Sequence, residues 1–484
     1  MTAVTVTVLA AAVVVGLVQA GALARPPDLS GARSRVRGLD PVLVAAAVGG
    51  LLRLGWVTVA TRTPTELRDP AEYLRIAGDL GHGILPRFAG IDHSAYWPPG
   101  YPAVLSPFVA VADRTGWLSP AYAASLVNVA AGTILVVLTA RLARRWFGPR
   151  PAVVAAWAIA LCPALVYWTA TAHTESVFAP VLVGLVLLCG WAAERGGARP
   201  WLLTGVAVGA AFLIRSPALV LVPVPALTLR ATTGSWAGAV RATGLLLVGA
   251  VVVLAPWAVR NGVQVGHWSP ASTNNAAAAC FGHNDGARPT WEDSLADPEL
   301  QLRCFRSSPF DDPRAIALLE GGRDAAELPD GLELTRPDEA RWYQETMGDA
   351  VRWAVTHPVE EVSLSVRKVW HTWSDEGRVV DGARNYAEPG WAGAWQRPLG
   401  VLANLWTWVV GGLAIAAMVR RPATRRATPV WVPVVAYTVM IVGGVAEPHY
   451  RYPVVPLVAV LAASWWASTS SRVPAPERAT ASMT

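Results

Sequence analysis

The stretch Leu245–Val259, which reads LLLVGAVVVLAPWAV, decides the class of fold. It is apolar and of helix length, and a second run, Leu9–Ala24 (LAAAVVVGLVQAGALA), has the same character. Runs that approach 20 apolar residues are typical of helices that cross a membrane. The chain of 484 residues is 53% apolar and 15% charged, whereas soluble proteins carry about 25% charged residues. The sequence therefore predicts an all-α polytopic membrane protein.

Apolar runs recur along the chain and predict about 11 membrane-spanning helices, within a range of 10–13. The residues before Leu9 include no basic side chain, so we expect a first membrane helix there rather than a cleaved signal peptide. The run 101–112 is either a further helix or a re-entrant piece, and the runs around Arg215 are either one broken helix or two short ones. The predicted spans are 3–23, 41–60, 119–140, 151–170, 176–194, 201–214, 217–230, 242–259, 397–419, 429–446 and 452–468.

The charged residues indicate how these spans are oriented. The formal net charge of +6 comes almost entirely from arginine, since Lys368 is the only lysine. Arginines gather in alternate connections, and the positive-inside rule makes that side cytoplasmic. We expect a multi-pass plasma-membrane protein and no nucleic-acid partner, because arginines at span ends serve membrane topology. The composition suggests an actinobacterial source. The connections concerned carry Arg25, Arg33, Arg35, Arg37, Arg141, Arg144, Arg145, Arg150, Arg195, Arg199, Arg230, Arg241, Arg420, Arg421, Arg425 and Arg426.

Four parts follow from the order of the spans. Residues 1–259 form an N-terminal transmembrane module whose first outer loop is 61–118. Residues 260–396 form an extracytoplasmic segment, which we expect to be loop-like over its first half. Residues 397–468 carry the last spans, and 469–484 are expected to be a disordered cytoplasmic tail. Two helical stripes in the outer segment are expected to be packing faces, namely Tyr343, Met347, Ala350, Ala354 and Val362, Val366, Val369, Trp373.

The four cysteines divide between the membrane and the outer face. Cys162 and Cys189 fall in apolar spans, where packing is the expected role. Cys280 and Cys304 share the outer segment, where disulfides can form. We therefore predict a Cys280–Cys304 bridge, and the alternative is two free thiols.

The first outer loop contains a short amphipathic helix near its start. Tyr73 begins an apolar stripe with helical spacing, and Gly81 and Gly83 end the helix. Asp69 precedes Pro70 and stands three residues before Glu72, which is a typical helix start. Two interpretations of Asp69 are open. It caps the helix, or it is a general base held at the boundary of water and lipid.

A stiff aromatic corner, AYWPPGYP, follows at Ala95–Pro102. The paired prolines force an extended path, and Gly100 allows a sharp turn. Tyr96, Trp97 and Tyr101 are of the types that favour a membrane–water interface, so an interfacial anchor is expected. Asp92 lies just upstream as a second acidic candidate.

Several motifs in this order resemble a known family. They are RDPAEYLRIAGDLGHG, YWPPGYP, HTESVFAP, AFLIRSPALVLVP, APWAVRNGVQVGHWSPASTNNAAAACFGHND and HYRYPVVPLVAVLAA, which together span roughly 65–285 and 440–465. The chain is similar to bacterial membrane glycosyltransferases of the GT-C superfamily, close to glycosyltransferase family 39. That family includes protein O-mannosyltransferases and aminoarabinose transferases. The resemblance implies a GT-C-like helical bundle with extracytoplasmic loops that carry short amphipathic helices.

The resemblance also implies a chemistry. Family members use a polyprenyl-phosphate-linked sugar donor, an active site on the outer face and inversion at the anomeric carbon. An acidic residue early in the first outer loop acts as the base, and Asp69 occupies the matching position. Family members often have adjacent acidic residues there, whereas Glu72 is separated from Asp69 by two residues. This departure leaves the role of Glu72 open and keeps Asp92 as a reserve base.

Arginine suits a departing phosphate because its planar fork donates paired hydrogen bonds. Three arginines at the outer ends of spans are the candidate phosphate ligands, in the order Arg260, Arg215, Arg451, and Lys368 is a fourth candidate. The alternative for each arginine is a side chain that reaches from the membrane to its surface. His173 and Glu175 lie in a tight outer turn and are either solvated or bind a sugar. The candidate sugar or acceptor ligands are Tyr73, Tyr96, Trp97, Tyr101, His173, Glu175, Asn261, Asn275 and His283.

Three functions compete at this point. The favoured one is an inverting glycosyltransferase whose acceptor is a protein, lipid or cell-wall glycan, with a hexosyl or pentosyl donor. The second is a transporter or flippase of a lipid-linked glycan, for which Arg53, near the middle of a span, and the broken run at Arg215 are the supporting features. The third is a non-catalytic scaffold that binds prenyl phosphates. No cofactor is required in the first, since guanidinium can pair with the phosphate, and a lone His–Glu pair is weak support for a metal.

Overall fold

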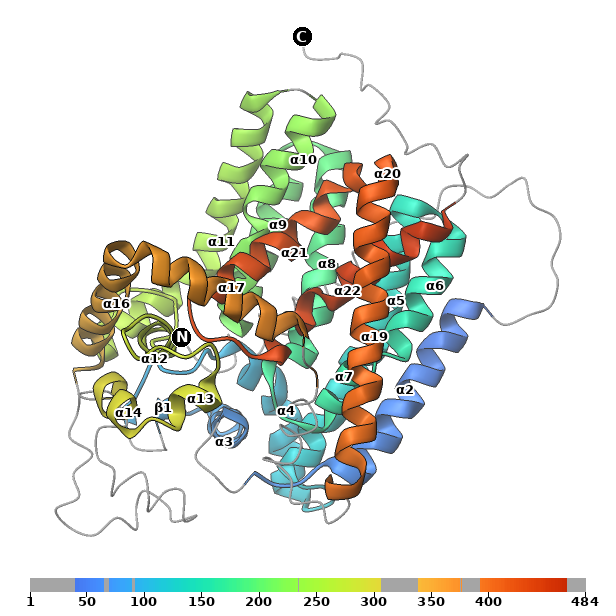
Figure 1. Cartoon of the computed structure of the whole chain (residues 1–484). Helices are drawn as coiled ribbons and strands as arrows, with labels where there is room; N and C mark the ends of the chain where they lie inside the picture. The colour runs from blue at the N-terminus through green and yellow to red at the C-terminus, as the bar shows by residue number, and fades with distance from the viewer. Residues whose placement is uncertain are drawn as a thin grey trace.

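Figure 1 shows the computed structural model of the chain, which describes residues 40–64, 69–88, 92–233, 235–305, 338–374, 376 and 392–467. Almost all of these residues lie in helices. The regular strands that they include are β1 (Arg87–Phe88) and β2 (Asp92–His93), which pair antiparallel. The all-α class expected from the sequence is therefore confirmed. The predicted span 3–23 and the tail 469–484 lie outside the described residues.

Five helices of the described chain are long and apolar enough to cross a membrane. A sixth span is formed if α6 (Pro149–Ala160) and α7 (Pro163–Tyr167), which meet at a bend of 52°, are counted together with η1 (Trp168–Ala170). The multi-pass membrane class is confirmed, whereas the predicted count of 11 is not. The five helices are α2 (Pro41–Ala60), α5 (Pro120–Phe147), α8 (Thr174–Arg195), α11 (Trp236–Val265) and α19 (Ala392–Arg420).

Shorter apolar helices complete the bundle. The chain is broken at Arg215, because α9 (Ala198–Ile214) ends just before it and η2 (Ser216–Leu221) begins just after it. The run 101–112 is part of one regular helix, α4 (Gly100–Thr115). The remaining helices of the bundle are α10 (Pro223–Thr233), α20 (Pro422–Arg426), α21 (Thr428–Val442), η4 (Pro448–Val454), α22 (Val455–Ala463) and η5 (Ser464–Trp466).

Local sequence signals set the starts of the long helices. The Asp40 carboxylate accepts a hydrogen bond from the Val42 N–H (2.9 Å), and Pro41 is the first residue of α2. The Ser119 hydroxyl accepts one from the Tyr122 N–H (3.2 Å) at the start of α5, again with a proline in the first turn. A capping oxygen followed by proline satisfies the free N–H groups and presets the helical backbone.

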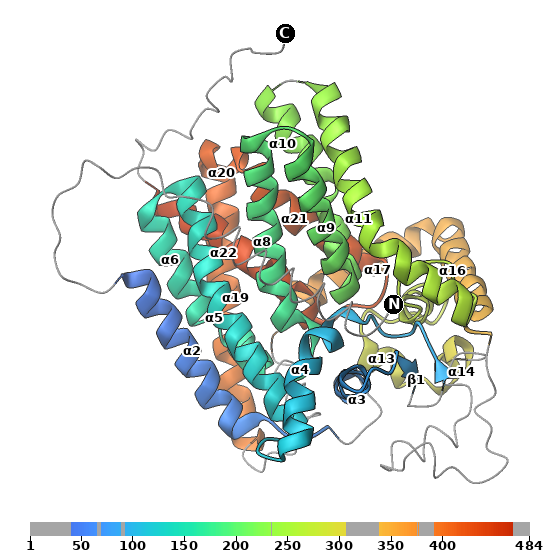
Figure 2. The same cartoon turned by 180° about the vertical axis from the view of Figure 1, so that it is seen from behind.

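Small residues bring α9 and α11 into close contact. A Cβ atom added at Gly205 would lie 2.0 Å from the carbonyl oxygen of Leu246, and one added at Gly249 would lie 2.2 Å from that of Leu202. Glycine at these points lets the two backbones touch, which is how helices commonly associate inside membranes. The pair forms a rigid wall of the bundle, seen from behind in Figure 2.

Arg53 of α2 stabilises the bend between α6 and α7. Its side chain is fully buried and donates to the carbonyl oxygens of Gly49 (3.0 Å), Ile159 (3.1 Å) and Ala160 (3.4 Å). The last carbonyls of a helix lack partners within the helix, and lipid offers none. Arg53 therefore serves as a C-terminal cap for α6, and its position in a span does not indicate a transport path.

The two ends of the bundle differ. The last residues of α10 and the first of α11 lie at one end, together with α20 and its Arg425 and Arg426. The amphipathic helix α3 (Asp69–Gly81), with α4, the strands and the helices of the outer segment, lies toward the other end (Figure 1). The arrangement agrees with the sidedness read from the arginines.

The outer segment is more helical than the sequence suggested. Helix α11 continues to Val265, and three short helices follow before the described chain stops at 305. The segment 260–338 was expected to be loop-like, and this expectation is wrong for its described part. The second predicted packing stripe is also wrong in part, since Val362 and Val366 are exposed by 65% and 64%. The helices of this segment are α12 (Asn274–Gly282), α13 (Trp291–Leu295), α14 (Pro298–Phe305), α16 (Glu339–Thr356) and α17 (Pro358–Ser374).

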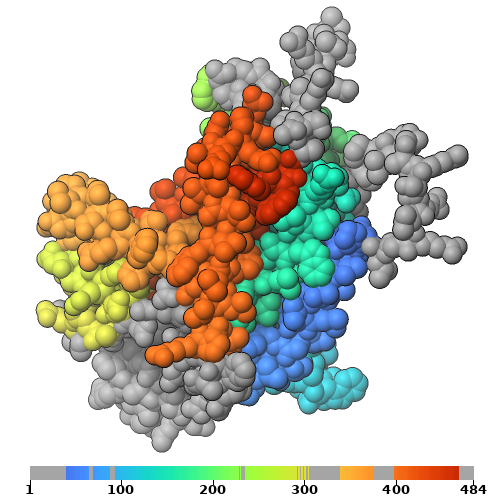
Figure 3. Space-filling model, turned by 45° about the vertical axis from the view of Figure 1, so that its right-hand side comes forward, coloured from blue at the N-terminus to red at the C-terminus, as the bar shows by residue number. Residues whose placement is uncertain are grey.

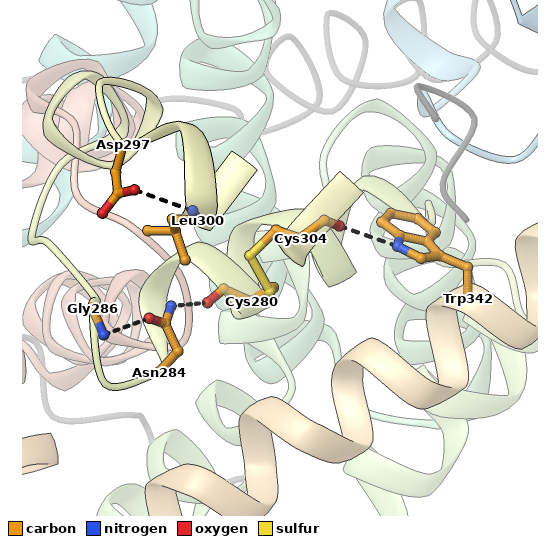
Figure 4. The surroundings of a disulfide bond; sticks show 7 residues. All are labelled: Cys280, Asn284, Gly286, Asp297, Leu300, Cys304 and Trp342. Atoms are coloured by element: carbon orange, nitrogen blue, oxygen red, sulfur yellow. Dashed lines mark hydrogen bonds between the residues drawn. A yellow bond between two sulfur atoms is a disulfide. The ribbon is translucent and has the colours of Figure 1, made fainter. Parts of the chain in front are cut away.

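A disulfide between Cys280 and Cys304 joins α12 to α14 (Figure 4). Its surroundings are held by local hydrogen bonds, in which the Asn284 amide donates to the Cys280 carbonyl (2.7 Å) and the Trp342 indole donates to the Cys304 carbonyl (3.2 Å). Trp342 belongs to α16, so its hydrogen bond attaches a third helix to the two that the disulfide joins. Cys162 and Cys189 are free thiols buried in the bundle.

Candidate active site

The aromatic corner is fixed by a close contact between α4 and α9. A Cβ atom added at Gly100 would lie 2.5 Å from backbone atoms of Leu213 and Ile214. Only glycine fits at such an approach. Because Arg215 follows directly, the corner is placed beside the break between α9 and η2.

The aromatic side chains of the corner are buried in protein. Tyr96, Trp97 and Tyr101 are only 7%, 4% and 0% exposed. The expectation that they anchor the chain at the lipid interface is therefore wrong. The Tyr101 hydroxyl donates to the Asn128 side chain (3.3 Å), whose amide in turn donates to the Thr171 carbonyl (2.8 Å). Tyr101 thus links α4 to the turn that precedes α8.

Residues from distant segments hold the backbone just before the corner. Arg260 donates to the carbonyl oxygens of Ser94 (2.7 Å) and Pro86 (2.8 Å). The Glu339 carboxylate accepts from the Ala95 N–H (3.1 Å). The terminal nitrogens of Arg260 are thus bonded to the backbone of the first outer loop. Its role as the first candidate for phosphate binding has no support from this geometry.

Asp69 is the first residue of α3 and faces the corner. The Trp97 indole N–H donates to the Asp69 Oδ1 atom (2.8 Å), so the carboxylate is held by a buried ring. Burial raises the pKa of Tyr73 and of Tyr96, and the negative charge of Asp69 raises both further. The Asp69 carboxyl therefore lies near two buried phenols. Its role as a base stays a prediction.

Glu72 is bound to a different partner. Its carboxylate, 2% exposed, accepts from the Nε (3.0 Å) and Nη2 (2.7 Å) atoms of Arg75. Arg75 also pairs with Asp79 (2.7 Å), which pairs with Arg87 (3.2 Å). This network fixes the polar face of α3 to β1. The backbone of the reserve base Asp92 lies in β2, whereas its side chain lies outside the described part of the chain.

Arg215 lies at the centre of a second polar group. Its Nη1 atom donates to Glu175 (2.5 Å) and to the Thr174 hydroxyl (2.6 Å), and its Nε atom donates to the Tyr437 hydroxyl (3.2 Å). The ring of Tyr450 covers the guanidinium at 5.3 Å. Within the described chain the Nη2 group has no hydrogen-bond partner, and the side chain is 19% exposed. Arg215 therefore keeps donors for a ligand.

Glu175 and His173 are buried by 99% and 95%. The alternative that they are solvated turn residues is wrong. Trp168 stacks with His173 (4.9 Å) and with His449 (4.7 Å), and the His449 ring lies 3.8 Å from the Glu175 carboxylate. Burial lowers the pKa of His173 and lowers that of His449 to about 3, so both rings are neutral at pH 7. Neutral rings leave the Glu175 charge to Arg215.

The two polar groups are neighbours. Tyr73, His173 and Tyr450 each interact electrostatically with both Asp69 and Arg215. A carboxylate and a guanidinium with an open side are therefore brought together from α3 and from the break after α9. We call the set Asp69, Trp97, Tyr73, Tyr96, Trp168, His173, Glu175, Arg215, Tyr437, His449 and Tyr450 the candidate site.

Arg451, the third predicted phosphate ligand, lies in a sealed environment. It is fully buried, forms an ion pair with Glu376 and donates to the carbonyl oxygens of Thr372 and Pro448. The Tyr452 hydroxyl completes the group by donating to Glu376 (3.0 Å). A phosphate has no access to this guanidinium, so the structure contradicts the predicted role.

The other predicted ligands lie outside the candidate site. Lys368 is fully buried and donates to the carbonyls of Gly282 (2.9 Å) and Val442 (3.0 Å), which also contradicts a phosphate role. The remaining three have no hydrogen bond or ion pair to Asp69 or Arg215 in the described chain. Asn261 donates to the Ser269 carbonyl (2.9 Å), His283 pairs with Glu361 (2.8 Å), and Asn275 is half-buried in the first turn of α12.

Four aromatic or histidine residues of the site were not predicted, namely Trp168, Tyr437, His449 and Tyr450. The motif HYRYP was noted for its arginine, and its histidine and first tyrosine were the available signal. Tyr437 lies within an apolar run and gave no signal. Among the described residues, no three His, Cys, Asp or Glu side chains are grouped so that they could hold a metal ion. The absence of a cofactor requirement stays a prediction.

One family is matched in a region that carries part of this site. Its sequence model, described as dolichyl-phosphate-mannose-protein mannosyltransferase, matches residues 97–259. The chain is similar to glycosyltransferase family 39 of the GT-C superfamily. The resemblance expected from the motifs is thereby confirmed, and the matched region includes Trp97, Glu175 and Arg215. No curated protein matches the chain.

Solved structures of membrane enzymes are similar to the chain at low identity. The oligosaccharyltransferase AglB from Archaeoglobus fulgidus, in complex with an inhibitory peptide and a dolichol-phosphate, matches with a TM-score of 0.47 and 14% identity over 88% of this chain and 49% of that one. ArnT from Cupriavidus metallidurans, bound to undecaprenyl phosphate, matches with a TM-score of 0.39 and 16% identity over 87% and 77%. The chain spans about half the length of AglB. Its activity, substrates and partners are therefore proposals.

Proposed function

We propose that the chain is an inverting glycosyltransferase that transfers a sugar from a polyprenyl-phosphate donor to an acceptor hydroxyl. The family match supports the reaction class, and the shared neighbours of Asp69 and Arg215 support the chemistry. We place the reaction on the extracytoplasmic face of the plasma membrane, because the candidate site lies toward the end of the bundle opposite the arginine-rich connections.

The proposed step is a single displacement. The Asp69 carboxylate takes the proton of the acceptor hydroxyl, whose oxygen attacks the anomeric carbon of the sugar. The bond between that carbon and the phosphate oxygen breaks, and polyprenyl phosphate leaves with the bonding electrons. The free Nη2 group of Arg215 donates to the departing phosphate, where an oriented cation stabilises the developing charge.

The observation that carries the proposal is that the three candidate arginines differ in how many of their hydrogen-bond donors are already bonded to protein. The terminal nitrogens of Arg260 and Arg451 are bonded to protein, whereas Arg215 has no hydrogen-bond partner at Nη2 within the described chain and shares neighbours with Asp69. The Trp97 indole fixes one oxygen of Asp69 and leaves the other for an acceptor. A fixed base beside an open cation suits a transfer in which a proton is removed and a phosphate leaves.

The test is transfer in reconstituted membranes. Purified protein in liposomes receives radiolabelled polyprenyl-phosphate mannose, glucose, galactose or arabinose together with cell-envelope acceptors, and labelled acceptor is counted. We expect Asp69→Asn to lower the transfer rate by about 10²–10⁴-fold, because the amide cannot take the proton. Asp113→Asn, an exposed carboxylate of α4, is the matched control and should retain the rate.

Transfer that survives Asp69→Asn unchanged would remove Asp69 as the base. Folded protein that transfers none of these sugars, but moves a lipid-linked glycan across the liposome membrane, would favour the transporter reading instead. The structure offers that alternative little support, since Arg53 is occupied as a helix cap. Addition of a chelator tests whether a metal is needed.

A further inference from the structure

Helix α17 presents its apolar residues outward. Val359, Val362, Val366 and Trp370 are 77%, 65%, 64% and 69% exposed. They recur every three or four residues, so they form one continuous arc along the helix. In a soluble protein such an arc would face the core, because contiguous apolar surface is rarely left in contact with water. Where it is exposed, it usually contacts a membrane or a partner.

The opposite side of α17 faces the protein and carries polar groups. Leu364, Lys368 and Thr372 are 2%, 0% and 0% exposed and lie on this buried side. Lys368 donates to the carbonyl groups of the last residues of α12 and α21. The Thr372 carbonyl accepts from Arg451 in η4. The helix is therefore inverted with respect to water, with polar bonds inward and valines outward.

The C-terminal end of α17 lies at membrane depth. The Trp408 indole of α19 donates to the Ser374 carbonyl, the last residue of α17 (3.1 Å). Trp408 is central in the apolar stretch Arg397–Arg420, a span of 24 residues. At about 1.5 Å per residue, it lies roughly 17 Å from each end of that stretch. The end of α17 is thus beside the middle of a membrane-spanning helix.

The exposed arc is continuous with surfaces that face lipid. Residues of α19 next to Trp408 are apolar and exposed, as are residues of α21, whose end bonds to Lys368. The space-filling view shows α19 at the surface with the residues of α16 and α17 beside it (Figure 3). The exposed apolar residues are Val401, Leu402, Leu405, Trp408 and Val409 on α19, and Val435, Val439 and Met440 on α21.

We infer that α17 is a membrane-embedded helix whose Val359–Trp370 arc contacts phospholipid acyl chains. It lies in the leaflet on the side of α3. Exposed Glu360, Ser363 and Arg367 lie on the adjoining arc, which turns toward the headgroups. Through the contact between Thr372 and Arg451, the embedded helix also fixes η4, which carries His449 and Tyr450 of the candidate site.

Two neighbouring exposed positions test this inference. Val366→Cys and Arg367→Cys are labelled with a bimane probe in phosphatidylcholine nanodiscs, and wild-type protein, whose free cysteines are buried, reports background labelling. We expect the probe at 366 to be quenched several-fold more by nitroxide-labelled phospholipid than by aqueous iodide, and the probe at 367 to show the reverse. Val362→Cys repeats the apolar position if Val366→Cys is not monodisperse.

Equal quenching by iodide at 366 and 367 would place the arc in water and overturn the inference. Shielding of 366 from both quenchers, together with a disulfide-linked dimer of Val366→Cys after mild oxidation, would assign the arc to a second copy of the chain and also overturn it. None of these measurements depends on sugar transfer, so they hold or fail independently of the proposed activity.

Discussion

Two arginine–glutamate pairs in this molecule have the same chemistry and opposite access. Arg215 pairs with Glu175, and Arg451 pairs with Glu376. Both carboxylates are 1% exposed, whereas the arginines are 19% and 0% exposed. The Tyr437 and Thr174 hydroxyls complete the Arg215 group, and the Tyr452 hydroxyl with two backbone carbonyls completes the Arg451 group. The difference lies in the donors that remain, since only the Arg215 group keeps an amino group open.

The comparison shows that an arginine in a promising motif is not by itself a ligand. A buried ion pair loses the hydration of both charges, and hydrogen bonds must replace it. In the Arg451 pair, groups of α17 and η4 supply those bonds and close the site. In the Arg215 pair the break between α9 and η2 leaves one side unfilled. Access, rather than residue type, separates a structural pair from a candidate for phosphate binding.

The largest effect is expected at the sealed pair. Arg451→Met leaves the Glu376 carboxylate buried without its cation, which costs about 3–5 kcal/mol of the free energy of unfolding. Thermal unfolding in detergent micelles measures this loss. The double variant Arg451→Met, Glu376→Leu removes both charges and should recover most of it. An Arg451→Met protein with native stability and impaired donor binding would reverse the comparison.

A smaller effect, on rate, is expected at the open pair. Arg215→Lys keeps the charge beside Glu175 but loses the planar fork, so transfer should fall by about 10²–10³-fold while the unfolding temperature stays near that of the wild type. Steady-state kinetics with a polyprenyl-phosphate sugar measures the change in kcat. Arg260→Lys is the matched control, since the terminal nitrogens of Arg260 are bonded to backbone. A loss of stability without a specific loss of kcat would make Arg215 structural as well.

The sequence identified most of this arrangement in outline and missed what depends on access. Apolar run length predicted the helical membrane class, and two outer cysteines predicted a disulfide that the structure contains. The break at Arg215 was visible as two short runs. Periodicity predicted the α17 stripe but placed it inward, because the rule assumes water outside and the neighbour of this helix is lipid.

The burial of the candidate arginines was the main property that the sequence could not predict. Arg215, Arg260 and Arg451 all follow apolar spans, so their sequence contexts are alike. Their environments are set by residues far along the chain, such as Tyr437 beside Arg215 and Glu376 beside Arg451. Those partners are fixed only when the bundle packs, and no local pattern reports them.

His449 lies between the two pairs and should make stability depend on pH. Burial, with smaller effects of the Arg215 and Arg451 charges, lowers its pKa to about 3, although the Glu175 charge opposes the shift. Unfolded histidine has a pKa of about 6.5, so below that pH the unfolded chain binds a proton that the folded chain does not. As the pH is lowered below about 6.5, this residue should therefore decrease the free energy of unfolding by roughly 1.4 kcal/mol per pH unit.

Unfolding midpoints of the wild type and of His449→Gln between about pH 4.5 and 7.5 measure the contribution. The variant should lose less stability on acidification, although His173 retains a similar dependence because its pKa is also lowered by burial. Parallel curves for the two proteins would show that His449 takes up its proton equally in the folded and unfolded chains, and the protonated ring would then compete with Arg215 for Glu175.

The smallest effect on the transfer rate is expected at Trp97, which holds the proposed base Asp69. Trp97→Phe preserves a buried ring but removes the indole donor that fixes Asp69. A hydrogen bond to a charged group contributes about 1.5–3 kcal/mol, so its loss should slow transfer by about 10–10²-fold. Trp342→Phe removes an equally buried indole donor, the one bound to the Cys304 carbonyl, and should leave the rate unchanged. Equal rate losses in the two variants would mean that Trp97 acts through packing alone. A loss confined to Trp97→Phe would show that Asp69 must be held in place to act near Arg215. The Arg451 pair is closed to ligands, so no comparable residue can act beside it.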